Sequence, residues 1–69
     1  MDRDQLVKML DAARQRIHET RRVVTSGVQA SITPYYIHIG LRHHPDYHAT
    51  QEQIKALFPP SVDVRFAFH

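Results

Sequence analysis

Residues 35–41, YYIHIGL, alternate between large apolar side chains at the odd positions and Tyr36, His38 and Gly40 at the even positions. Because successive side chains of a strand point to opposite faces of a sheet, this pattern predicts a strand with one apolar and one mixed face. Residues 62–68, VDVRFAF, alternate in the same way and predict a second strand with valine and phenylalanine on its inner face. The fold depends on how these two strands are joined.

Between the strands, Thr50 and Gln53 have the spacing of a capping box, in which two side chains satisfy free amides at the start of a helix. Apolar residues follow at helical spacing until Pro59 and Pro60, which stop a helix because proline has no amide proton and restricts the residue before it. The pattern predicts a short helix over residues 50–58. A right-handed crossover between parallel strands is the favoured connection, although so short a helix also allows others.

The N-terminal part of the chain predicts a long helix from Asp2 to about Thr25. Asp2 is a suitable N-cap, and Ser26 with Gly27 supplies a C-terminal cap in which glycine takes the left-handed conformation. Six residues at spacings of three and four form a seam along one side of this helix. They are Leu6, Leu10, Ala13, Ile17, Thr20 and Val24.

A helix of this span is about 35 Å long, whereas a seven-residue strand covers about 23 Å. The excess seam would face water in a monomer, so the sequence predicts a homo-oligomer, expected as a dimer, that covers it with a second copy. A helix that frays or kinks near Thr20 is the alternative, and it leaves less apolar surface to cover. Arg14 and Arg21 follow the edge of the seam, where we expect their stems to lie beside apolar surface or their charges to form salt bridges between subunits, with an anion-binding ridge as the alternative.

The remaining segment, residues 28–32, also alternates, and Pro34 interrupts it before the next strand. It is either a separate short edge strand or part of one long strand that bends at the proline. We therefore predict a single small α+β domain of the order αβ(β)αβ, with both helices on one face of a two- or three-stranded sheet. Its parts are a helix and cap over residues 1–27 and a sheet with the short helix over residues 28–69.

The loop before the short helix carries the residues most suited to chemistry. A phosphate-bearing small ligand, such as a nucleotide, is one interpretation, because free helix amides and positive side chains attract anions. A divalent metal held by histidine and Asp46 is the second, although the loop has neither a cysteine pair nor an HExxH motif. A solvent-facing turn around Pro45 is the third. The candidate ligand-binding residues are Arg42, His43, His44, His48 and Thr50.

The first two interpretations predict opposite pH trends. Histidine gains a positive charge near pH 6.5, so a phosphate ligand would bind more tightly as the pH falls through that range. A metal would bind less tightly, because its histidine ligands must lose their protons.

On the free face of the sheet, Tyr36, His38 and Arg65 are expected to lie close together if the two strands are neighbours. Aromatic and cationic side chains on an open sheet can stack nucleic-acid bases. Tyrosine and arginine are also frequent anchors of protein interfaces. With one tyrosine on this face, we favour the protein interface.

Composition limits the function classes. The chain has 69 residues, no cysteine and a formal net charge of +2 with six histidines uncounted. This balance permits nucleic-acid binding without requiring it. No apolar run is long enough to cross a bilayer and the start does not resemble a signal peptide, so we expect a cytoplasmic protein that does not contact membranes.

No nucleophile, phosphate-binding glycine motif or paired acid–base spacing indicates an enzyme, and nothing indicates a cofactor. The sequence therefore predicts a small, non-enzymatic, homo-oligomeric interaction protein that regulates or inhibits a partner macromolecule whose identity the residues do not reveal. Binding of a phosphate-bearing ligand or of nucleic acid through the arginine- and histidine-rich surfaces is the alternative.

Overall fold

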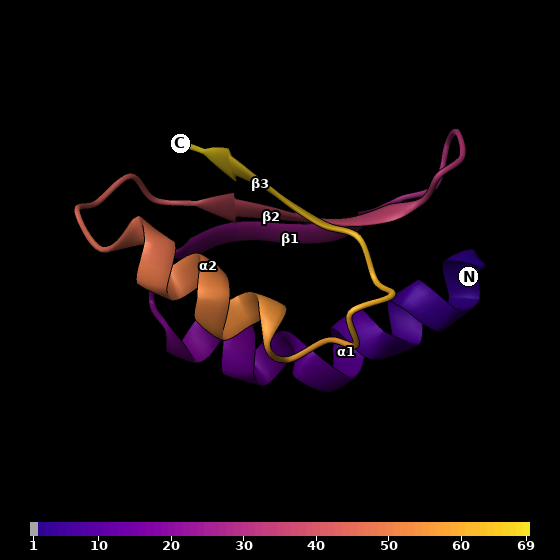
Figure 1. Ribbon diagram of the computed structural model, residues 1–69, viewed down its shortest axis with the longest axis horizontal. Coiled ribbons are helices and arrows are strands. Elements are labelled where there is room, and N and C mark those ends of the chain that lie inside the picture. Colours follow the sequence, from indigo (N-terminus) through magenta and orange to yellow (C-terminus); the bar gives the residue numbers. More distant parts are fainter. Residues whose placement is uncertain (1) are drawn as a thin grey trace.

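The computed structural model describes residues 2–69, and Met1, the first residue of the predicted N-terminal unit, lies outside them. The five elements are α1, β1, β2, α2 and β3, in that order. Their bounds are Arg3–Glu19, Val23–Gln29, Tyr36–Leu41, Tyr47–Lys55 and Val64–Phe68. Both helices lie beneath one face of the sheet, as Figure 1 shows. The predicted α+β fold is confirmed.

The sheet has the strand order β1-β2-β3, with β1 antiparallel to β2 and β2 parallel to β3. The two strands predicted from YYIHIGL and VDVRFAF are thus parallel neighbours, and α2 is the crossover between them. Ile37 pairs with Val64 and Ile39 with Phe66. This register brings the apolar side chains of both strands to the side on which the helices pack.

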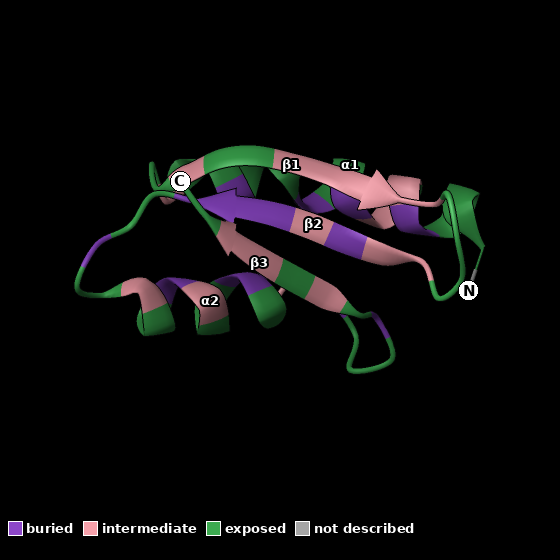
Figure 2. Ribbon diagram, turned by 90° about the horizontal axis from the view of Figure 1, so that it is seen from above, coloured by how far each residue is buried: buried purple, intermediate pink, exposed green. Residues whose placement is uncertain are grey.

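Strand β2 is the centre of the core. Ile37, Ile39 and Leu41 are fully buried on it, and Figure 2 shows β2 as the strand with most of its length buried. Full burial of such a side chain stabilises the fold by about 1.5–3 kcal/mol. The other buried members of this cluster are Leu6, Leu10, Ala13, Ile17, Ile54, Phe58 and Val62.

Helix α1 ends at Glu19, so the predicted end near Thr25 was wrong. Thr20 is the C-cap, and its hydroxyl donates to a helix carbonyl at 2.9 Å and accepts from the Arg22 amide at 3.2 Å. Arg21 has a φ of 58°, the left-handed conformation that commonly ends a helix. The alternative of a break near Thr20 is the one observed. At the other end, the predicted Asp2 cap is confirmed as a complete capping box.

The chain after the break becomes β1, so the predicted cap at Ser26 and Gly27 was also wrong, since both lie inside this strand. Three β-branched residues open the strand, and such residues favour strand over helix. The predicted segment 28–32 contributes its first two residues to β1, which is an edge strand separate from β2. The 17-residue α1 is about 25 Å long and therefore matches the seven-residue β1.

Within residues 2–69, neither helix has the length and apolar character needed to cross a membrane.

Candidate functional site

His44, one of the predicted ligand-binding residues, points into the protein and is only 9 % exposed. Its Nδ1 accepts a hydrogen bond from the Asp46 amide at 3.1 Å, and its Nε2 lies 3.4 Å from Thr50 Oγ1. A ring nitrogen that accepts carries no proton, so the neutral ring has its proton on Nε2. Burial, followed by the nearby charge of Arg22, lowers the pKa of His44 from its ordinary value of 6.5. His44 is therefore neutral, and its ring contacts hold the loop in place.

The predicted capping box at Thr50 was wrong, because Thr50 is buried inside α2. Its hydroxyl lies 3.5 Å from the Asp46 carbonyl, one helical turn earlier. Asp46 is the N-cap, although its side chain makes no capping hydrogen bond. The contacts between His44, Asp46 and Thr50 stabilise a helix start at Tyr47, three residues before the predicted one, and the helix also ends earlier, at Lys55. Two of the five predicted ligand residues, His44 and Thr50, thus make contacts within the fold.

The other three predicted ligand residues, Arg42, His43 and His48, are exposed at the end of the sheet where β2 and β3 finish. The His43 ring centroid lies 5.5 Å from that of Phe68, and the His48 centroid lies 4.0 Å from that of Tyr47. The two histidines therefore belong to an aromatic cluster. Among residues 2–69, no three histidine, aspartate or glutamate side chains form a group that could hold a metal ion.

The predicted helical seam is buried against the sheet of its own chain. Leu6, Leu10, Ala13 and Ile17 are the buried residues of α1, whereas Val24 lies on β1 and is 46 % exposed. The homo-oligomer remains a prediction, but the seam from which it was predicted is buried within one chain and is not exposed.

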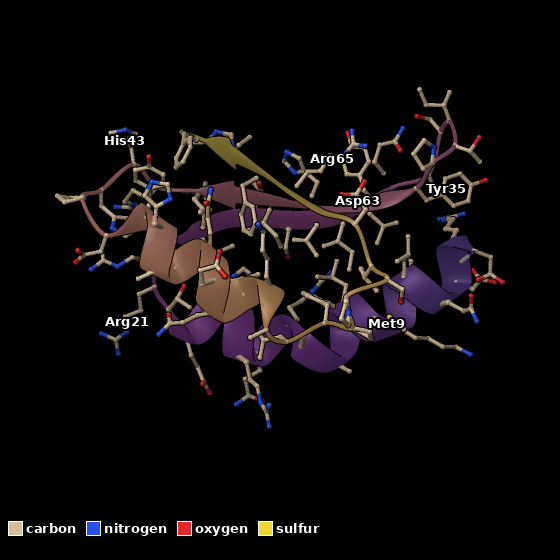
Figure 3. The ribbon with its side chains drawn as sticks, viewed as in Figure 1. Met9, Arg21, Tyr35, His43, Asp63 and Arg65 are labelled. Carbon is tan, nitrogen blue, oxygen red and sulfur yellow. The ribbon has the colours of Figure 1, made fainter. Side chains whose placement is uncertain are left out.

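The two arginines predicted beside that seam are separated. Arg14 lies 3.5 Å from Asp11 in an exposed ion pair within α1. Arg21 has left the helix and projects from the end of the molecule, away from the sheet (Figure 3). No common ridge is formed.

Tyr36, His38 and Arg65 are brought together, as the alternation predicted, on the face of the sheet opposite the helices. His38 pairs with Arg65 across β2 and β3. The central guanidinium carbon of Arg65 lies 4.2 Å from the centroid of the Tyr36 ring, within the range of a cation–π contact. Asp63 Oδ2 accepts from Arg65 Nε at 3.1 Å and lies 3.0 Å from Arg65 Nη2. In Figure 3, Arg65 stands above the sheet with Asp63 beside it.

Two polar residues that the sequence analysis missed complete this open face. Thr25 pairs with Gly40 on the neighbouring strand. A side chain at Gly40 would meet Thr25 Oγ1, and its Cβ would lie 2.7 Å from His69 Nε2. Both side chains thus lie over the glycine, and a larger residue there would displace them. Alternation could have placed Gly40 on this face, but Thr25 was assigned to the helix and His69 follows the predicted strand.

Charge is distributed unequally between the helices and the rest of the chain. Residues 2–19 together with α2 contain five basic and five acidic side chains, so the helical layer is formally neutral. The strands and loops contain four arginines and two aspartates: Arg21, Arg22, Arg42 and Arg65 against Asp46 and Asp63. The whole formal charge of +2 therefore belongs to the strands and loops. Within residues 2–69 the salt bridges are Arg14–Asp11 and Arg65–Asp63, which leaves three of these four arginines unpaired.

No protein-family model matches this sequence, and searches among curated proteins and solved structures likewise find no match.

Proposed function

We propose that the protein binds single-stranded nucleic acid across the open face of its sheet. The observation that carries this proposal is the Arg65–Tyr36 stack, which holds a cationic plane on the uncovered face of the sheet. Proteins that bind single strands combine positive charge along the backbone path with aromatic or guanidinium planes on which bases stack. The unpaired Arg22 and Arg42 meet at the end of the same sheet, where the Arg42 amide donates to the Arg22 carbonyl at 2.7 Å.

The composition of the open face favours nucleic acid over the protein interface preferred from the sequence. Stable protein interfaces have an apolar core, whereas Tyr36 is the one large ring among the side chains that alternation brings to this face. They belong to Thr25, Gln29, Tyr36, His38, Arg65, Ala67 and His69, with Gly27 and Gly40 between them. Regulation of a protein partner by a homo-oligomer therefore ranks second, since the apolar seam that suggested it is buried.

Fluorescence anisotropy with a labelled oligothymidylate tests the proposal. Each phosphate contact with a single strand contributes about −0.7 to the slope of log affinity against log salt. Arg42→Ala, which removes one of the unpaired charges, should therefore make the slope less negative by about 0.7, and Arg65→Ala should weaken binding because it removes the stacked plane. Arg14→Ala is the matched control, because it removes the same charge from an exposed ion pair on the helical layer.

Tyr36 provides the second half of the test. Loss of one base–aromatic stack reduces affinity by about 1–3 kcal/mol, so Tyr36→Ala should bind at least fivefold more weakly, whereas Tyr36→Phe should bind almost as the wild type. Equal losses from Arg14→Ala and Arg65→Ala, or affinity that does not change with salt, would show that this face is not the nucleic-acid site. Circular dichroism of each variant verifies that it is folded.

A further inference from the structure

The outer edge of β3 differs from the open face and from the edge of β1. Strand β3 pairs with β2 alone, so its other side has no neighbouring strand among residues 2–69. The Asp63 carbonyl accepts from Ile37, and the His69 amide donates to Leu41. Because backbone groups alternate in direction along a strand, Val64, Phe66 and Phe68 present their amides and carbonyls to the free edge. The β1 edge is instead interrupted by an irregularity between Val23 and Thr25, which discourages pairing.

Helix α2 lies beside this edge, and a hollow opens at the start of β3. Seen from above in Figure 2, α2 is not hidden by the sheet but lies beyond the outer side of β3. The Tyr47 ring of α2 meets Phe68 edge-on at a centroid distance of 5.0 Å. Towards the other end, Lys55 and the residues from Pro59 to Val64 line a hollow beside the start of β3.

The apolar side chains of β3 on the helix side are incompletely covered. The side chains of Val64, Phe66 and Phe68 point to the helix side, yet none of the three is buried, and Phe68 is 45 % exposed. An extended segment added beside β3 would pair with the free backbone groups and cover these side chains. Addition of a strand to a free edge is a recurrent mode of peptide recognition, in which backbone hydrogen bonds supply affinity and pockets for alternate side chains supply specificity.

The positive charge of Lys55 favours an acidic segment at this edge. The Lys55 ammonium lies 5.9 Å from the centroid of the ring of Phe66, the middle residue of β3, and forms no salt bridge with the described residues. Asp63, the acid beside the hollow, is paired with Arg65. A second copy is unfavourable here, because antiparallel pairing of two β3 strands around Phe66 would bring both Lys55 side chains to the same symmetry axis. We propose that the free edge of β3 binds an extended acidic segment of a protein partner as a fourth strand, with its carboxylate at Lys55.

The proposal predicts the pattern of the segment. Side chains at alternate positions would face the helix side, so apolar residues would fit the hollow beside Val64 and the Phe68–Tyr47 end, with an acidic residue between them. The peptide acetyl-TVTETVT-amide has this pattern, and acetyl-TVTKTVT-amide is its charge-reversed control. This site is separate from the open face, so its success or failure leaves the nucleic-acid proposal untouched.

Titration of the ¹⁵N-labelled protein with both peptides tests the inference. The glutamate peptide should shift the amide signals of Val64, Phe66 and Phe68 and bind more tightly than the lysine peptide. Lys55→Glu should bind the lysine peptide more tightly than the glutamate peptide, by roughly fivefold or more, because the attractive contact with glutamate becomes repulsive. Lys8→Glu, the same change on the exposed side of α1, should leave the preference as it is in the wild type.

Three results would overturn the proposal. The first is equal affinity for both peptides in the wild type, and the second is absence of β3 shifts at millimolar peptide. The third is protection of the β3 amides that rises with protein concentration when no peptide is present, which would identify a second copy as the occupant.

Discussion

Removal of buried methyl groups from Ile17 tests whether α1 belongs to the core of one chain or to an interface between two. Ile17 is 0 % exposed. Ile→Val substitutions in cores typically lower stability by about 0.5–1.5 kcal/mol, and substitutions of such residues by alanine by about 2–5 kcal/mol. A chain of this size has a free energy of unfolding of roughly 3–10 kcal/mol. Ile17→Ala should therefore remove much of the folded population, and Ile17→Val is the variant in which the loss can be measured.

The assay is urea unfolding followed by circular dichroism, at two protein concentrations that differ widely. With a urea dependence of about 1 kcal/mol per molar, Ile17→Val should lower the midpoint by about 0.5–1.5 M, equally at both concentrations. Val24→Ala is the matched control, because the sequence placed Val24 in the same seam but the structure exposes it on β1. Its midpoint should change by less than about 0.5 M. A loss at Ile17 that differs between the two concentrations, or a larger effect at Val24 than at Ile17, would refute the assignment of α1 to the core.

Three further substitutions test individual contacts. Asp2→Ala removes the N-cap of α1 and should destabilise the protein by about 1 kcal/mol in urea unfolding, while an unchanged midpoint would mean that the cap contributes nothing. Gly40→Val would push the exposed Thr25 and His69 side chains aside, so it should lower the stability measured by urea unfolding by less than the roughly 1–3 kcal/mol typical of an overpacked core. Because the pKa of His44 is lowered in the folded state, the unfolded chain takes up its proton first, and stability should fall as the pH drops below about 6.5. The fall should be smaller in His44→Gln, and an equal fall in both proteins would contradict a buried neutral His44.

The parts of the fold that were predicted correctly depend on strict alternation. In residues 35–41 and 62–68 a shift of one position would expose every apolar side chain, so only one facing of each strand buries them. The same alternation brought Tyr36, His38 and Arg65 together, because their positions on the two strands determine which face they share.

The errors arose where signals from short segments compete with tertiary contacts. Ser26 and Gly27 resemble a helix end, but the helix stops earlier at Arg21, a residue that seldom adopts positive φ and that no sequence rule identifies as a cap. Thr50 has the spacing of a capping residue, yet its hydroxyl bonds inside the helix and to His44. The burial of His44 depends on this three-dimensional contact with Thr50. Nothing in the sequence around His44 therefore distinguishes it from its exposed neighbours.

Mapping the contact surface of a bound oligonucleotide by NMR is the most direct test of the central claim that the open face of the sheet binds single strands. In a titration of the ¹⁵N-labelled protein with oligothymidylate at low salt, the largest amide shifts should fall on Gly27, His38 and Arg65, and they should disappear as salt is added. The exposed side of α1, reported by Ala12 and Arg16, should remain unchanged. Shifts confined to the helical layer, or no shifts at any salt concentration, would contradict the account.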